Sequence, residues 1–176
     1  MSGKHVVLCL LVPALVLAAG SARAGVVSFS IGQHHFADST VKDTFGGNWS
    51  ASLRWPMGTN TSIEFLAAEF HNKDKVFGTT YDRYNGFWSF MIDVHPEASL
   101  DKEGRDKPFY VGLGAGLVGV DLDPDTASDS LYGFAWQAYA GVNLGRRFFV
   151  EAKYINGGQD GLIAGYSLNL GARWHK

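Results

Sequence analysis

Six charged residues of this 176-residue chain stand in stretches that are otherwise apolar or small. In an extended strand each would point to the face opposite its bulky apolar neighbours. A single buried charge is costly, whereas opposite charges brought together on a buried face neutralise one another. The residue types therefore predict a structural ion network rather than a catalytic centre. Its expected members are Arg54, Glu64, Asp93, Glu151, Lys153 and Arg173.

Two further groups resemble metal ligands but lack the required spacing. The neighbours His34 and His35 would point to opposite faces of a strand, so they could not share an ion. The Asp-x-Asp-x-Asp run at 121–125 begins like a calcium loop. Thr126 and Tyr132 stand where such a loop needs its glycine and its final glutamate. We therefore predict no metal site, no cofactor and an acidic solvated loop.

The first 24 residues have the features of a secretory signal peptide. An apolar run at 6–19 follows Lys4, and it is too short for a membrane-spanning helix, which needs about 20 residues. Ala22-Arg23-Ala24 supplies the small-x-small cleavage pattern. We expect residues 25–176 to form one domain, without the chain's single cysteine, Cys9. A formal net charge of −2 gives no support to nucleic-acid binding.

The elements that would position the charged residues are strands, because period-two alternation recurs along the rest of the chain. Turn residues (Gly, Pro, Asn and Asp) separate the alternating segments. This pattern predicts an all-β fold, an eight-stranded antiparallel up-and-down β-barrel. The segments lie at about 27–32, 48–55, 62–67, 84–94, 109–118, 134–144, 148–155 and 162–174.

Such a barrel could hold its apolar face inside, like a lipocalin, or outside, like a transmembrane barrel. The face opposite the bulky apolar one is rich in glycine and small polar residues, which suits a narrow lumen better than a soluble exterior. Glycines there would make room for Tyr110, Tyr139 and Phe149. We therefore expect a membrane barrel with a packed polar lumen. A periplasmic lipocalin-like ligand binder and a gated pore are the alternatives.

Aromatic residues fall near both ends of the expected strands, as two girdles at the membrane surfaces would require. With both termini in the periplasm, the segments 37–46, 71–82, 121–130 and 156–160 become extracellular loops. The segment 96–107 is long for a periplasmic turn. The girdle residues would be Trp55, Phe109, Phe148 and Trp174 at the periplasmic ends, and Trp49, Tyr84 and Tyr154 at the opposite ends.

The strand PFYVGLGAGLVGV and the ending LIAGYSLNLGARW resemble small outer-membrane β-barrels of the OmpA-transmembrane-domain and opacity-protein type. The similarity covers nearly all of residues 25–176. It implies a monomer in the outer membrane, in contact with lipid and lipopolysaccharide, inserted by the barrel assembly machinery. Loops on a rigid scaffold commonly carry function, so a host or envelope partner would bind there.

The segment EAKYINGGQDGLIAGYSL more distantly resembles the lipid A 3-O-deacylases, which are also eight-stranded barrels. Those enzymes carry a His-x-Ser pair on the strand before the last. At the matching positions this chain has Lys153 and Ile155, and Ile163-Ala164 stands where the acid is expected. Neither a hydroxyl nucleophile nor an imidazole base is available. We predict that the chain is not an enzyme, with a lipid A acyl hydrolase as the alternative.

Overall fold

The computed structural model describes residues 26–38, 47–58, 60–76, 79–94, 108–121, 130–158 and 161–175. The expected signal peptide lies outside these residues, as does the whole of the 96–107 segment. Of the expected loops at 37–46, 121–130 and 156–160, the residues 37–38, 121, 130 and 156–158 fall within them. No helix in this described part is long and apolar enough to cross a membrane.

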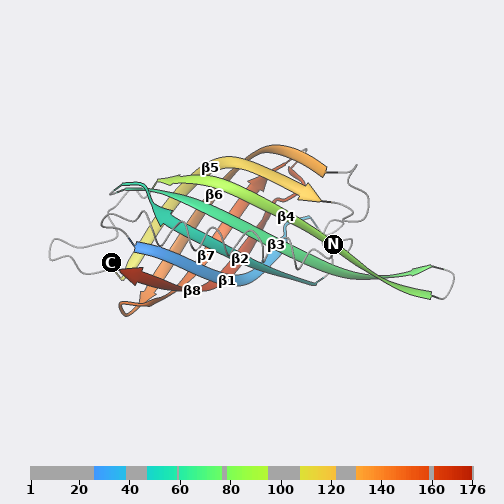
Figure 1. Ribbon diagram of the computed structural model, residues 1–176, viewed down its shortest axis with the longest axis horizontal. Helices are drawn as coiled ribbons and strands as arrows, with labels where there is room; N and C mark the ends of the chain where they lie inside the picture. Colours follow the sequence, from blue (N-terminus) through green and yellow to red (C-terminus); the bar gives the residue numbers. More distant parts are fainter. Residues whose placement is uncertain are drawn as a thin grey trace.

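Eight antiparallel strands form a closed barrel, which confirms the expected fold class (Figure 1). Each strand pairs with its neighbours in sequence, and the first pairs with the last. The strands are β1 (Val26–Phe36), β2 (Gly47–Pro56), β3 (Thr61–Val76), β4 (Thr79–Val94), β5 (Phe109–Asp121), β6 (Ser130–Leu144), β7 (Phe148–Gly157) and β8 (Gly165–His175).

The barrel has two different ends. At one end, here called the base, β1 begins and β8 ends, with Val26 opposite His175. The base also carries the short turns after β2 and β6. At the other end, here called the rim, β1 and β8 pair as far as Phe36 and Gly165. All eleven residues of β1 are paired to β8, so the barrel is closed along the whole length of β1.

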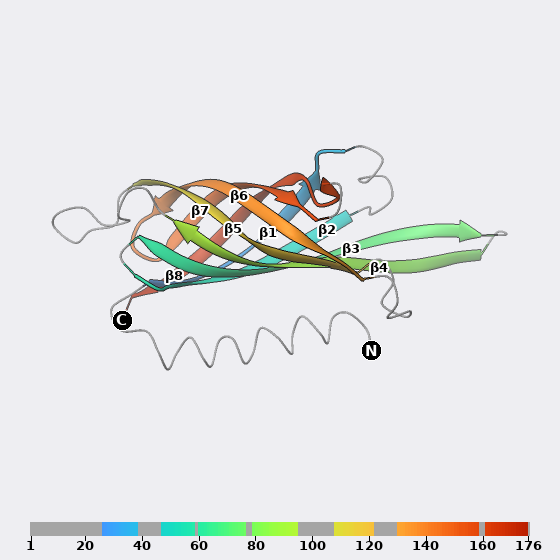
Figure 2. The same ribbon diagram turned by 90° about the horizontal axis from the view of Figure 1, so that it is seen from above.

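The hairpin of β3 and β4 projects beyond the rest of the rim (Figures 1 and 2). Its ladder continues without a break to the pair Val76–Thr79. The expectation of a turn-rich loop at 71–82 is therefore wrong, because most of that segment is regular strand. β2 stops pairing with β3 at His71, and β5 stops pairing with β4 at Gly86.

The side chains alternate in the way that a transmembrane barrel requires. Outward residues are apolar and exposed, such as Phe109 at 70% and Leu113 at 58%, whereas the inward residues Glu64 and Gln137 are fully buried. The outward residues Ala51, Leu53, Ala67 and Glu69 are exceptions, because they are also buried and Glu69 is charged.

The last strand begins later than its alternation predicts. Leu162 lies before β8, which starts at Gly165. Gly158 and Gly161 both have φ near +75°, a conformation that favours glycine, and they reverse the chain between β7 and β8. The backbone N–H of Ala164 donates to the carbonyl of Gly161 at 2.8 Å. This turn directs Ile163 into the lumen, where only 1% of it is exposed.

Candidate functional site: a lumen packed in layers

The centre of the ion network is Arg54 of β2, which reaches three carboxylates. It lies directly opposite Glu64 of β3, with Nη2 and Oε2 3.0 Å apart. The turn fixes this register, because Pro56 pairs with Ser62. Both Nη atoms of Arg54 also donate to Glu151 of β7, at 2.9 and 3.1 Å. Its Nε lies 3.2 Å from Asp93 Oδ2.

Lys153 of β7 completes the network on its other side. Its Nζ donates to Glu64 and lies 3.6 Å from Glu151 Oε1. Thus two basic groups serve three carboxylates, and all five side chains are buried. Such burial is tolerable only because each charge has a partner at contact distance.

Two neutral residues that were not predicted as members of the network also bind these carboxylates. Gln137 of β6 donates through Nε2 to Glu64 and to Asp93, at 2.7 Å each. The hydroxyl of Tyr110 donates to Glu151 at 3.0 Å. Both residues stand at inward positions of β5 and β6, whose inward faces carry no charged residue. This pattern could have identified them from the sequence.

Arg173 lies beside the network without joining it. No carboxylate of the described residues forms an ion pair with it. Instead its guanidinium lies over the rings of Tyr110 and Phe149, 4.7 and 4.8 Å from their centroids. Arg54 in turn lies 4.2 Å from the ring centroid of Tyr139. Cation–π contacts of this kind stabilise a desolvated cation.

Glycines make room for the three lumen rings, as the sequence predicted. Tyr139 lies opposite Gly112, Tyr110 opposite Gly141, and Phe149 opposite Gly171. A Cβ atom at any of these glycines would collide with the facing ring. The rings form a cluster of their own on the base side of the barrel, next to the charged residues.

Hydrophobic side chains fill much of the rim half of the lumen, so the expectation of a uniformly polar lumen is wrong there. Hydrophobic side chains from the walls meet Ile163, which folds in from the β7–β8 turn. The cluster contains Phe36, Leu66, Ala68, Phe70, Phe87, Met91, Val118, Val120, Ala135, Ile155 and Ile163.

His34 is the polar residue among these rings, and its neighbour His35 lies on the other face of β1. The imidazole of His34 is 1% exposed and packs edge-on against Phe36 and Phe87, at 5.1 and 5.2 Å. His35 is exposed and stacks on Tyr166 at 5.4 Å. The two imidazoles therefore face away from each other, as alternation predicts.

The resemblance to the deacylases would place Lys153 and Ile155 at the positions of the His-x-Ser pair. Both side chains point into the lumen, Lys153 into the ion network and Ile155 into the rim cluster. Ile163 also lies in that cluster. Lys153 therefore neutralises buried carboxylates, and Ile155 and Ile163 pack in the hydrophobic cluster.

The expected girdle residues lie on the outward face, except that nothing is described of the Tyr84 side chain. Phe109, Phe148 and Trp174 are exposed at the base. Further outward rings outside the predicted girdle set lie in the rim half, where Trp88 packs near Tyr132, and Trp136 packs near the predicted Tyr154. Gly119 provides the space for Trp88. The remaining predicted girdle residues are Trp49, Trp55 and Tyr154. Trp49 is 40% exposed, and the other two have intermediate exposure.

Comparison with solved structures identifies the fold. The N-terminal β-barrel domain of Pseudomonas aeruginosa OprF aligns over 87% of this chain and 98% of that domain, at a TM-score of 0.56 and 13% identity. The Yersinia pestis outer-membrane protein Ail, in a phospholipid nanodisc, aligns over 85% of this chain and 99% of that one, at 0.52 and 15%. No family model and no curated protein matches the sequence.

The fold is therefore that of the small eight-stranded outer-membrane β-barrels. The resemblance that the sequence motifs indicated is confirmed at the level of the fold.

Proposed function

We propose that this chain is a non-enzymatic outer-membrane β-barrel with a closed lumen, acting in envelope structure or surface interaction through its rim. The observation that carries this proposal is the outward face, where exposed apolar and aromatic residues surround a barrel whose ion network is inside. In water such a surface would aggregate, whereas in a bilayer it faces hydrocarbon. We also propose that residues 1–24 are a cleaved signal peptide, that the base faces the periplasm and that the rim faces the exterior of the cell.

The projecting β3–β4 ribbon supports a role at the cell surface. Beyond the pairs His71–Gly47 and Gly86–Asp121, the two strands pair only with each other. At about 3.3 Å per residue, the five residues after His71 extend the ribbon by roughly 17 Å. Both edges of this ribbon are free of neighbouring strands within the described ladder, so they can accept a partner.

The packed lumen favours a plug over a pore. A ring layer, an ion network and an apolar cluster follow one another from base to rim, and an eight-stranded lumen is only wide enough for side chains. An acyl hydrolase is disfavoured because Lys153 and Ile155 are engaged in this packing. The expected partners are outer-membrane lipid, lipopolysaccharide, the barrel assembly machinery and a host or envelope molecule at the rim, with the chain as a monomer.

Fractionation of expressing cells tests the location. We expect the chain in the outer membrane, with a gel mobility that differs between unheated and boiled samples because the closed barrel resists detergent. A soluble periplasmic protein without a mobility shift would instead support the lipocalin-like ligand binder. Release of acyl chains from labelled lipid A by the purified barrel would support the hydrolase.

A shortened ribbon tests the surface role. Residues 73–82 are replaced by Asn-Gly, a two-residue turn that closes a hairpin. We expect expressing cells to lose any gain in adhesion to one another or to epithelial cells, while the heat-dependent gel shift is kept. Equal adhesion by cells carrying the original and the shortened ribbon would contradict the role of the ribbon.

A further inference from the structure

The wall of the barrel has a split seam between β1 and β2. Their backbone ladder runs from Ser28–Arg54 to Gly32–Ser50 and stops there. Both strands continue toward the rim, and β1 stays paired to β8 and β2 to β3. Toward the rim from Gly32, the two strands therefore separate without leaving the barrel.

A side-chain amide bridges the split. The backbone N–H of His34 donates to Oδ1 of Asn48 at 2.7 Å, and Nδ2 of Asn48 donates to the carbonyl of His34. In a continued ladder these two residues would exchange backbone hydrogen bonds. The side chain of Asn48 takes that place, and the strands stand apart by its width.

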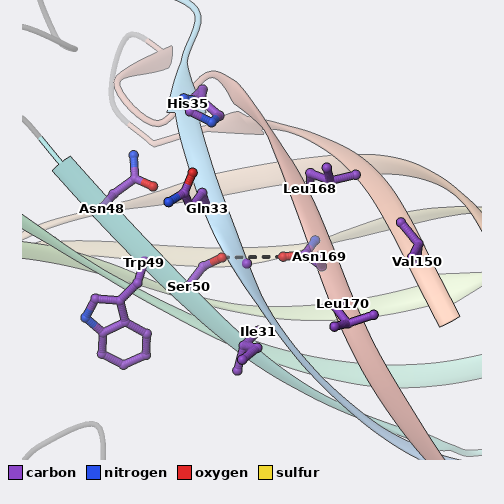
Figure 3. A pocket seen from close by; sticks show the side chains of 11 residues that line it. Ile31, Gln33, His35, Asn48, Trp49, Ser50, Val150, Leu168, Asn169 and Leu170 are labelled. Atoms are coloured by element: carbon purple, nitrogen blue, oxygen red, sulfur yellow. Dashed lines mark hydrogen bonds between the residues drawn. The ribbon is translucent and has the colours of Figure 1, made fainter. Parts of the chain in front are cut away.

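The floor of the split is polar. Ser50 of β2 donates to Oδ1 of Asn169 of β8 at 3.5 Å, across the lumen side of β1 (Figure 3). Gly32 lies between them on β1. A Cβ at this position would collide with Oδ1 of Asn169 and with the carbonyl of Leu168, so only glycine permits this crossing.

A groove of about 760 Å³ lies over this seam and opens on the outward face. Its rim side is polar and its base side is apolar, as the labelled side chains of Figure 3 show. Toward the rim lie Gln33, His35 and Asn48. Toward the base lie Ile31, Val150 and Leu170, with Leu168 and Trp49 along the sides.

The position of the groove determines what can fill it. Gln33 is seven residues from the start of β1. At about 3.3 Å per residue along a strand tilted by about 40°, it lies about 18 Å above the base of a band roughly 25 Å tall. The outward surface around the groove is apolar, so the groove is continuous with the lipid-facing belt. In hydrocarbon an unpaired polar group costs several kcal/mol, so the carboxamide of Gln33 needs a partner.

We propose that the seam groove is a binding site for one acyl chain of an outer-leaflet lipid. The chain lies along Ile31 and Leu170, and the carbonyl that links it to its headgroup accepts a hydrogen bond from Gln33. This site rests on the proposed membrane location. It differs from general lipid contact in two ways. It holds one acyl chain in a fixed place, and it binds an ester-linked chain more tightly than an ether-linked one.

The chain offers a matched pair of fluorescent reporters for this site. Trp49 lines the groove and is 40% exposed, and Trp136 lies on β6 with 43% exposed. Two variants each keep one of these residues, with the other four tryptophans changed to phenylalanine. Each is reconstituted in vesicles with increasing fractions of phosphatidylethanolamine that carries brominated acyl chains, which quench tryptophan on contact.

We expect Trp49 to reach half-quenching at about a fivefold lower fraction of brominated ester lipid than Trp136. An ether lipid with the same brominated chains lacks the linking carbonyl and should lose most of that advantage. Gln33→Leu should remove the difference between ester and ether lipid at Trp49. A fivefold effect corresponds to about 1 kcal/mol, which is typical of one hydrogen bond.

Filling the groove gives a second, independent readout. Leu168→Phe enlarges a groove residue and should move the quenching curve of Trp49 onto that of Trp136. Leu117→Phe is the control, since Leu117 lies on β5 with nearly the same exposure, 60% against 62%. The heat-dependent gel shift verifies that each variant is folded.

The proposal is overturned if Trp49 and Trp136 give the same curve, if ester and ether lipid quench Trp49 equally, or if Leu168→Phe acts no more than Leu117→Phe. Loss of quenching at both tryptophans has a different meaning. It would show that the chain is not in the bilayer, which contradicts the proposed function itself.

Discussion

At the scale of single residues, the ion network depends on Lys153 because Glu64 and Glu151 share it with Arg54. Lys153→Met keeps the length of the side chain and removes its charge. Three buried carboxylates then depend on the guanidinium of Arg54 alone. We expect the free energy of unfolding to fall by about 3 kcal/mol, the usual cost of breaking a buried pair. Urea unfolding in lipid vesicles, followed by tryptophan fluorescence, measures this loss.

The double variant Glu64→Gln with Lys153→Met is the matched control. It removes one positive and one negative charge, so the net charge of the network is unchanged. We expect it to be more stable than Lys153→Met alone, with a coupling of about 1–3 kcal/mol between the two sites. Additive losses would show that the two side chains do not act as a pair.

A second prediction concerns the space between Gly112 and the ring of Tyr139. Gly112→Ala places a methyl group into that ring. Overpacking of this kind costs about 1–3 kcal/mol, measurable by the same unfolding experiment. Gly58→Ala is the control, because its Cβ would meet only the Thr61 hydroxyl, at 3.1 Å. If Tyr139→Leu does not lessen the cost of Gly112→Ala, the collision is not its cause.

Alternation in the sequence predicts which face each of these residues occupies, and it does so well. It does not predict which residues touch, because contacts inside a barrel depend on register and on the stagger between strands. Arg173 shares the inward parity of the network, yet it lies against rings at the base. The apolar rim cluster was hidden for a similar reason. Its members are spread over six strands and one turn, and no local window shows them together.

At the scale of elements, the β3–β4 hairpin is the largest departure from expectation. Inside a membrane, one face of a strand must be apolar, and this requirement produces a readable alternation. Above the membrane the constraint ends, so a ribbon there can be polar on both faces. The segment at 71–82 contains histidine, asparagine, lysine and aspartate, and it therefore looks like a loop although it is strand.

The orientation of this ribbon gives a prediction for intact cells. Thr80 lies on the projecting part of β4, and Arg146 lies in the turn at the base. Thr80→Cys should react with a membrane-impermeant maleimide on intact cells, in a background where Cys9 is removed with the signal peptide. Arg146→Cys should react only after the outer membrane is permeabilised. The reverse labelling pattern would place the rim in the periplasm.

At the scale of the whole molecule, closure and layering work together. The β1–β8 ladder removes the last free edge of the sheet, as a membrane location would require, because unpaired backbone groups are not tolerated in hydrocarbon. The lumen is then filled from base to rim by rings, ions and hydrophobic side chains. Because three kinds of packing lie in series, none of them alone controls passage through the barrel.

This arrangement predicts that the barrel does not conduct ions, with or without a charged network. Planar bilayers that contain the purified protein in 1 M KCl should show no stable single-channel steps, while an open porin run in parallel does. The double variant Glu64→Gln with Lys153→Met should be equally silent, because the ring layer and the rim cluster still block the path. Steady conductance of the original chain would contradict the plug. Conductance only in the double variant would show instead that the ion network is a gate.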